Sequence, residues 1–304
     1  MILSQWLRFS QLCYTNGMGN FSFKLDDDKI NKLKETFKEY IKPNKNEYID
    51  TFIQKDDLTI SIYTSKKVVF QGNDAFFYAS AYIDNKKTRQ AGSDEVGTGD
   101  VFGPVVVCSA IVEVEDYDFI EQNHITDSKQ LDDDFIRKIG PTLRNRFKHS
   151  LLILDNATYN KVHETDNLNA IKAKMHNKAF LNMLAKGYDI PKAAYIDQFC
   201  PEDDYYRYLI NEKDVYHGLT FETKAESKYP AVAVGSMISR YAFLEYMDKL
   251  DQKYGIKFQR GSSNTLEIDN NIQYIINKYG KNELNNIGKL HFKNFDRYRW
   301  DIIV

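Results

Sequence analysis

Two adjacent carboxylates, Asp94 and Glu95, stand immediately before a glycine-rich turn in the stretch AGSDEVGTGDVFGP of residues 91–104. The glycines at positions 97, 99 and 103 leave the backbone bare, so a ligand's own backbone could approach closely. Acidic oxygens beside exposed amide groups suit a hard metal ion together with a phosphodiester. The alternative for these residues alone is a hairpin turn with two solvated acids, because acids and glycines both favour turns.

Two further acids could complete such a site. Asp197 ends an apolar strand expected at residues 193–197, and Glu226 precedes a long helix expected at 231–250. Taken alone, Asp197 could cap a helix or a turn, and Glu226 could be a first-turn acid favoured by the helix dipole. Taken together, acids near the ends of several strands of one sheet can converge on a site that holds two divalent ions and hydrolyses a phosphodiester. Adjacent strand residues point to opposite faces, so Asp94 and Glu95 share a site only if the strand ends or bends at the glycine turn.

The elements that must position these acids form the larger of two units, residues 91–304. Alternating and continuous apolar runs predict strands, and apolar residues recurring every three or four positions predict helices. The expected strands are 92–95, 105–114, 150–154, 193–197 and 219–223, and the expected helices are 132–147, 169–187, 231–250, 270–279 and 283–291. This mixture predicts an α/β sheet covered by helices, with a helical C-terminal region.

A smaller unit precedes it. Strands are expected at residues 20–25, 48–54, 58–63 and 68–70, and helices at 75–82 and along the stripe formed by Ile30, Leu33, Phe37 and Ile41. These elements predict a small sheet with helices on one face, covering residues 18–83. The polar segment 84–90 is expected to be a linker. Residues 1–17 lack the hydrophobic centre of a signal peptide. They also do not lead periodically into the next strand, so they are expected to be a loosely ordered extension.

Composition bounds the class of protein. The chain has 304 residues, 42% of them hydrophobic and 28% charged, which is typical of a globular protein with one large domain or two smaller ones. Its 41 basic and 43 acidic residues give a net charge of −2, so any surface for nucleic acid must be a local patch. Cys13, Cys108 and Cys200 lie far apart and read as reduced thiols of a cytoplasmic protein, with no zinc site. No apolar run reaches transmembrane length, so no membrane partner is expected.

Five motifs occur in the order seen in bacterial type 2 ribonucleases H, and the closest resemblance is to ribonuclease HIII. They are GSDEVGTGD at 92–100, FGP at 102–104, DSK at 127–129, IDQF at 196–199 and TKAES at 223–227. The resemblance continues through residues 231–243 and ends at KLHFKN, residues 289–294. The smaller unit, with residues 62–72, resembles the TATA-binding-protein-like α+β domain that distinguishes ribonuclease HIII from HII. The resemblance therefore implies a ribonuclease H-like mixed sheet flanked by helices behind that small N-terminal domain.

The resemblance implies an endonuclease that hydrolyses the RNA strand of RNA/DNA hybrids with Mg²⁺ or Mn²⁺ and leaves 5′-phosphate and 3′-hydroxyl ends. Matching by motif, Asp94, Glu95 and Asp197 would be metal ligands. Glu226 matches the fourth acidic catalytic position, where related enzymes often carry Asp, and its role as a direct ligand or an outer base stays open. One metal would orient the attacking water, and the other would neutralise charge on the 3′ oxygen.

Substrate contacts follow from the same motifs. The backbone of Gly97, Thr98 and Gly99 would grip the ribose 2′-hydroxyl, which distinguishes RNA from DNA. Thr98 replaces the basic residue of HII-like enzymes, which implies weak action at a single ribonucleotide in DNA. The candidate contacts with the nucleic-acid backbone are Ser128 and Lys129 in the DSK motif and Lys66, Lys67 and Gln71 in the smaller unit. For the lysines of both groups the alternative is an ordinary solvated loop or hairpin turn.

Three further groups of residues stay open in the sequence. Lys172, Lys174 and His176 lie near one helix face, and only some of them could reach one ligand. His291 and Lys293 could contact substrate or end a helix. A monomer acting on RNA/DNA hybrid is expected, and the alternatives are a hybrid-binding module with a degenerate catalytic unit or another metal-dependent nuclease on the same fold.

Overall fold

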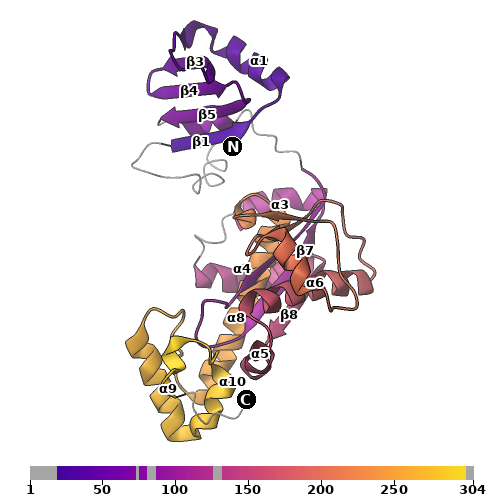
Figure 1. Cartoon of the computed structure of the whole chain (residues 1–304), viewed down its shortest axis with the longest axis vertical. Coiled ribbons are helices and arrows are strands. Elements are labelled where there is room, and N and C mark those ends of the chain that lie inside the picture. The colour runs from indigo at the N-terminus through magenta and orange to yellow at the C-terminus, as the bar shows by residue number, and fades with distance from the viewer. Residues whose placement is uncertain (1–18, 73–74, 81–86, 126–131, 299–304) are drawn as a thin grey trace. The chain divides into compact units, whose positions relative to one another are not determined.

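The chain divides into two compact units, Met1–Lys87 and Thr88–Val304. The computed structural model in Figure 1 describes residues 19–72, 75–80, 87–125 and 132–298. The expected extension at residues 1–17 lies outside the described residues, as do Ser128 and Lys129 and residues 84–86 of the expected linker.

The smaller unit is a five-stranded antiparallel sheet in the order β1-β5-β4-β3-β2. Its strands are β1 (Gly19–Lys24), β2 (Ile41–Lys42), β3 (Ile49–Lys55), β4 (Leu58–Tyr63) and β5 (Lys67–Gly72), and its helices are α1 (Asp27–Thr36) and α2 (Ala75–Ser80). Both helices share one hydrophobic core with the sheet, formed by residues such as Leu33, Ala75, Ile60 and Phe70. The prediction of helices on one face of a small sheet is confirmed.

The predicted helical stripe is wrong at its last residue. The α1 helix ends at Thr36, a 3-10 turn follows at Lys38–Tyr40, and Ile41 begins the edge strand β2. Ile41 pairs with Ile53 and keeps 43% of its surface exposed. Strand pairing therefore overrides the helical spacing at this position.

The larger unit contains a second five-stranded sheet, in the order β10-β9-β6-β7-β8. Its strands are β6 (Gln90–Val96), β7 (Val105–Val112), β8 (His149–Leu154), β9 (Ala194–Asp197) and β10 (Leu219–Glu222). The β7 strand runs antiparallel to β6 and β8, whereas β6, β9 and β10 are parallel to one another. The C-terminal ends of β6, β8, β9 and β10 therefore lie at one edge of the sheet.

Helices cover both faces of this sheet. They are α3 (Tyr117–Gln122), α4 (Asp133–Arg146), α5 (Asn156–His163), α6 (Leu168–Ala185), α7 (Glu202–Tyr208) and α8 (Pro230–Tyr254). Val105 and Val107 of β7 pack with α5 and α6, while Cys108 and Ala110 pack with α4 and α8. Every residue of β7 is buried, which explains why Ser109 is the one polar residue in an otherwise apolar strand. The α8 helix approaches so closely that a Cβ on Gly92 would lie 2.3 Å from the backbone nitrogen of Val232.

The C-terminal region packs on the end of α8 (Figure 1). It contains α9 (Thr265–Tyr279), the short α10 (Leu284–Ile287) and 3-10 turns at Lys281–Glu283 and Lys293–Phe295. The helix expected at 283–291 is wrong beyond Ile287, because Gly288 is extended and pairs with Phe102 in an isolated bridge. Within the described ranges, no helix is long and apolar enough to cross a membrane.

Candidate active site

Parallel pairing brings the predicted acids to one edge of the larger sheet. Ser93 of β6 lies opposite Ile196 of β9, so Asp197 at the end of β9 is a lateral neighbour of Asp94. The Oδ1 atom of Asp197 accepts a hydrogen bond of 2.8 Å from the backbone N–H of Ala225. That residue opens the 3-10 turn Ala225–Ser227, which places Glu226 next to α8 with 2% of its surface exposed. Three elements thus deliver acids outside the carboxyl ends of strands, where open α/β sheets commonly bind ligands.

Asp94 and Glu95 leave β6 toward opposite faces of the sheet, because β6 continues through Val96 without ending at the pair. The side chain of Ser236 on α8 lies near the carboxylate of Asp94 and opposes the effect of burial on its pKa. The carboxylate of Glu95 contacts α6, which covers the other face. The two acids therefore share the edge of the sheet rather than one of its faces.

Charge accumulates around Asp94, of which 7% is exposed. Burial raises the pKa of its carboxyl group most, and the nearby charges of Glu95 and Asp197 raise it further, to about 8. A desolvated carboxylate beside other carboxylates is stabilised by taking up a proton or a cation. The electrostatics of this edge therefore favour the binding of a positive charge.

Glu95 has the opposite electrostatic environment. Burial alone would raise the pKa of its carboxyl group, but the hydrogen bond and charge of His176 and the charge of Lys172 outweigh it and bring the pKa down to about 2. The Nζ atom of Lys172 lies 2.7 Å from Oε1 of Glu95, and Nε2 of His176 lies 2.9 Å from Oε2. Glu95 is thus held as a carboxylate by one partner on each oxygen.

A buried hydrogen-bond chain extends from Glu95 into the sheet. The hydroxyl of Ser109 on β7 donates to Oγ of Ser93 at 3.0 Å, and Ser93 lies 2.7 Å from Nδ1 of His176. The ring of Phe199, two residues after Asp197, stacks on His176 with ring centroids 5.5 Å apart. Sequence reasoning missed Ser93, Ser109 and Phe199 as members of the site, although Ser93 and Phe199 lie inside the family motifs.

Of the three α6 residues considered in the sequence, Lys172 and His176 reach the site and Lys174 does not. Positions four apart on a helix share a face, whereas a position two away points elsewhere. The Nζ atom of Lys174 accordingly lies 2.7 Å from Asp166, away from Glu95.

The glycine turn between β6 and β7 lies at the same edge. Gly97 has φ of 88°, and a Cβ there would lie 2.1 Å from the carbonyl oxygen of Pro104, so the fold itself requires glycine. Gly99 is exposed, and a Cβ on it would meet no atom within 4 Å. The space beside Gly99 is therefore open to a ligand, and its N-terminal neighbour Thr98 is partly exposed.

The C-terminal region braces this turn. The Nζ atom of Lys289, whose side chain is fully buried, donates to the carbonyl oxygens of Asp100 at 2.9 Å and of Gly103 at 2.6 Å. The Oδ1 atom of Asp100 also accepts a hydrogen bond from the backbone N–H of Gly261 at 2.7 Å. Burial lowers the pKa of the Lys289 ammonium to about 7, although the charge of Asp100 opposes the shift. The family motif at 289–294 contains Lys289, but its role depends on contacts that sequence alone does not show.

Comparison with known proteins agrees with this geometry. The family model described as Ribonuclease HII matches residues 91–295, and one described as a domain of unknown function, DUF3378, matches residues 20–95. Ribonuclease HIII of Phytoplasma mali is 37% identical over 288 residues, covering 92% of this chain and 98% of that protein. Ribonuclease HIII of Streptococcus mutans is 37% identical over 295 residues, covering 91% and 96%.

The chain belongs to the ribonuclease HIII family. It is therefore an enzyme of the ribonuclease H class. The crystal structure of Bst-RNase HIII in complex with Mn²⁺ matches it with a TM-score of 0.68 and 30% identity, covering 92% of this chain and 98% of that one. The expected fold, with its small N-terminal domain and helical C-terminal region, is confirmed.

The acids at this edge of the sheet carry carboxylate oxygens, a donor type that suits hard divalent cations. Within the described ranges, no three Asp, Glu, His or Cys side chains are arranged as a metal-binding group. The contacts explain this arrangement, since Glu95 is held by α6 and Asp197 by the backbone of Ala225. The donor chemistry and the charge around Asp94 fit a cation, and Glu95 is the acid that the present contacts direct away from it.

The remaining predicted contacts lie in the smaller unit. Lys66 has φ of 64° in the turn before β5, and its Nζ atom pairs with Asp27 at 2.8 Å. Lys67 and Gln71 are exposed on the face of β5 opposite the core residues Val68 and Phe70. Lys67 and Gln71 therefore share one face of the sheet, while Lys66 is engaged at its end.

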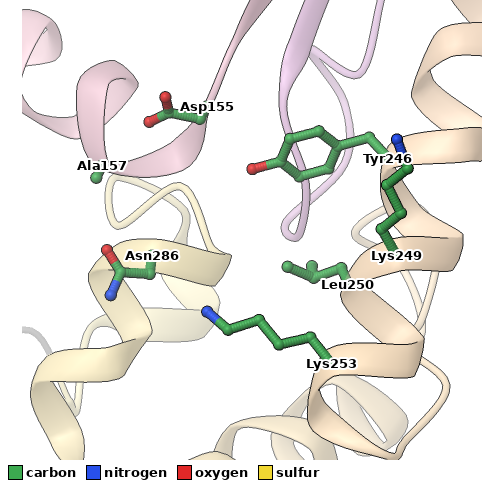
Figure 2. A pocket seen from close by; sticks show the side chains of 7 residues that line it. All are labelled: Asp155, Ala157, Tyr246, Lys249, Leu250, Lys253 and Asn286. Atoms are coloured by element: carbon green, nitrogen blue, oxygen red, sulfur yellow. The ribbon is translucent and has the colours of Figure 1, made fainter.

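A hollow of about 570 Å³ lies between the start of α5, the second half of α8 and α10 (Figure 2). Tyr246 points its hydroxyl into it toward Asp155, and Lys253 extends toward Asn286. Asp155 directly follows β8, so the hollow opens at the sheet edge that carries the acids. It is lined by Asp155, Ala157, Tyr246, Lys249, Leu250, Lys253 and Asn286, none of which was a predicted site residue.

His291 stacks on His163 with ring centroids 4.5 Å apart, and Lys293 lines a second hollow of about 430 Å³ near the start of α9.

Proposed function

We propose that this chain is an endonuclease that hydrolyses the RNA strand of RNA/DNA hybrids and leaves 5′-phosphate and 3′-hydroxyl ends. The observation that carries the proposal is the grouping of Asp94, Glu95, Asp197 and Glu226 at one sheet edge, beside a glycine turn that is open at Gly99. Membership of the ribonuclease HIII family supports it.

The proposed cofactor is Mg²⁺ or Mn²⁺, held by Asp94, Glu95 and Asp197, with Glu226 as the fourth catalytic acid. The crystal structure of Bst-RNase HIII in complex with Mn²⁺ supports a divalent cation as the cofactor. When bound, such ions would supply the activation of the attacking water and the stabilisation of the leaving 3′ oxygen. The chain's own contribution is to fix one oxygen of each of two acids. His176 fixes one oxygen of Glu95, and the N–H of Ala225 fixes one oxygen of Asp197.

The proposed recognition of RNA uses backbone rather than side chains at the cleavage site. The amide groups of Gly97, Thr98 and Gly99 would bind the 2′-hydroxyl, which DNA lacks. The fold leaves room for a Cβ at Gly99, so packing within the protein does not require glycine at this position. The close approach of a ribose would explain why glycine is present. Lys67 and Gln71 would contact the nucleic-acid backbone from the smaller unit, and Lys66 could do so only by leaving Asp27. Ser128 and Lys129 are proposed to contact a phosphate near the site, on the basis of their motif.

The test is cleavage of an end-labelled RNA/DNA hybrid with Mg²⁺ or Mn²⁺, beside single-stranded RNA and duplex DNA of the same sequence. We expect cleavage of the RNA strand of the hybrid alone. Tight hybrid binding without cleavage under either metal would instead indicate a binding module, and cleavage of duplex DNA would indicate another metal-dependent nuclease. The proposal includes a monomeric cytoplasmic enzyme, and sedimentation at the assay concentration tests the monomer.

A further inference from the structure

Lys172 is a buried cation that contacts Glu95, one of the acids of the proposed site. Only 8% of its surface is exposed, and its Nζ atom lies 2.7 Å from Oε1 of Glu95. Burying an ammonium group is costly unless a partner of opposite charge compensates it. The Nζ atom also lies 4.0 Å from the centroid of the Phe199 ring, within the range of a cation–π interaction. Lys172 therefore has two adjacent binding partners, one anionic and one aromatic.

The other oxygen of Glu95 is held by His176. The Ser109 hydroxyl donates to Ser93, and Oγ of Ser93 lies 2.7 Å from Nδ1 of His176. The ring nitrogen Nε2 of His176 donates to Oε2 of Glu95 at 2.9 Å. His176 thus anchors Oε2 through a hydrogen bond, and the ammonium group of Lys172 lies against Oε1.

We propose that Lys172 is a resident counter-ion that competes with a divalent cation for Oε1 of Glu95. This inference rests on the proposed role of Glu95 as a metal ligand. A metal ion bound to Oε1 and an ammonium group 2.7 Å from the same oxygen would repel each other strongly, so the two cannot share it. His176 keeps Oε2 in both states, and the ammonium of Lys172 moves onto the face of Phe199 when it releases Oε1.

The competition accounts for the directions of the side chains. Glu95 faces α6, and no group of three ligands is assembled among the described side chains. Exchange at Oε1 requires the ammonium of Lys172 to leave and Glu95 to turn toward Asp94 and Asp197. Lys172 is therefore a positioning residue that lowers the affinity of the metal-free protein for divalent cations.

The test measures Mn²⁺ binding to the full chain without substrate, by electron paramagnetic resonance of free Mn²⁺ and by calorimetry. We expect Lys172→Met to tighten Mn²⁺ binding by about tenfold, a conservative value for removing one charge a few ångströms away. Lys172→Arg keeps the charge and should stay near wild type. Lys174→Met is the matched control, because Lys174 lies on the same helix but pairs with Asp166.

Unchanged or weaker Mn²⁺ binding by a folded Lys172→Met variant would overturn the inference, since a purely structural lysine lowers stability without tightening metal binding. If Lys172→Met does not fold, Lys172→Gln takes its place, with the same expected direction. Asp94→Asn separates the two proposals. If Asp94→Asn binds Mn²⁺ as wild type does, the proposed metal site itself is wrong; if Asp94→Asn loses binding while Lys172→Met is unchanged, only the counter-ion inference is wrong.

Discussion

At the residue scale, the geometry of the proposed site depends on partners of Glu95 that never need to touch substrate. Groups that hydrogen-bond to metal-binding carboxylates orient them and tune their affinity. His176 is fully buried and holds Oε2 of Glu95, and Ser93 holds the opposite edge of the imidazole ring. The orientation of Glu95 is therefore set by residues on two different elements, α6 and β6.

We expect His176→Leu to lower kcat on RNA/DNA hybrid by about 10- to 100-fold, the usual effect of losing such a partner. Ser93→Ala should have a smaller effect of the same sign, because the imidazole stays but its tautomer is no longer fixed. Steady-state kinetics at saturating hybrid and metal measure this, with thermal unfolding as the control for folding. Wild-type kcat in a folded His176→Leu variant would show that Glu95 does not depend on this anchor.

The residues of this site differ in how far the sequence could predict them. Asp94, Glu95, Asp197 and Glu226 stand in short motifs, so their chemistry was visible before any fold was known. Helix periodicity also predicts that Lys172 and His176 share a face. Ser109 could not be predicted, because its contact with Ser93 depends on the register of β6 against β7, in which the two residues lie opposite each other.

At the element scale, the glycine turn combines one glycine that the fold requires with one that it does not. Gly97→Ala would place a methyl group against Pro104 at a positive φ, so we expect it to destabilise the fold by about 1–3 kcal/mol. Gly99→Ala should keep the stability of the wild type and lose cleavage of hybrid, because the methyl group fills the approach of the ribose. Denaturant unfolding and hybrid cleavage, measured on both variants, check the pair. Full activity of Gly99→Ala would contradict the proposed contact between the ribose and the backbone at this position.

Lys289 gives the brace of this turn a pH dependence. Its pKa is about 7 in the folded protein and near 10.5 in the unfolded chain, so between these values the unfolded state binds more protons. Below pH 7 both states are protonated, and the cost of burying the charge is fully present. This contribution therefore makes stability rise with pH from about 7 to about 10.5, by no more than about 1.4 kcal/mol per pH unit.

Lys289→Met should remove that contribution. We expect the free energy of unfolding of wild type minus that of Lys289→Met to increase with pH across this window, as measured by urea unfolding at several pH values. Lys293→Met, an exposed lysine of the same segment, is the control and should keep the wild-type dependence. A difference that is flat between pH 7 and pH 10 would show that Lys289 stays charged when buried.

Strands and helices in which apolar residues recur every two positions, or every three to four positions, could be predicted from the sequence. Elements whose bounds depend on tertiary contacts could not. Leu58, Ile60 and Ile62 alternate and form β4, as expected. The α7 helix was missed because residues 202–208 are rich in acids and tyrosines rather than in a simple apolar stripe. The helix predicted at 283–291 failed because Gly288 packs under the ring of Phe295, where a Cβ would lie 2.3 Å from it.

At the scale of the whole molecule, each unit has its own core. In the smaller unit, Leu33 and Phe70 belong to one hydrophobic core formed by residues of that unit alone. The larger unit has its own hydrophobic clusters, which pack around its sheet. We therefore expect residues 88–304 to fold alone and to cleave hybrid with a raised KM. The smaller unit would no longer contact the nucleic-acid backbone, so the affinity for hybrid should also depend less steeply on salt concentration.

Circular dichroism, KM and the slope of log affinity against log salt concentration measure this for residues 88–304 beside the full chain. Lys67→Ala together with Gln71→Ala in the full chain is the milder version and should change KM in the same direction. Equal KM and equal salt slope for the truncated and full chains would show that the smaller unit does not contribute to binding. The pattern of the sequence predicted the two units. The surface that binds a nucleic-acid duplex could not be predicted in the same way, because its only signs in the sequence are single lysine and amide side chains.

The central claim is that the acids at the sheet edge form the catalytic centre for RNA/DNA hybrid. The most direct measurement is cleavage and binding of a labelled hybrid by Asp94→Asn beside wild type, with binding followed in Ca²⁺. Asp116→Asn is the control, since Asp116 follows β7 at the opposite edge and pairs with Arg146. We predict that Asp94→Asn binds hybrid as wild type does and loses cleavage with both Mg²⁺ and Mn²⁺, while Asp116→Asn cleaves normally. Cleavage by folded Asp94→Asn at the wild-type rate would contradict the account.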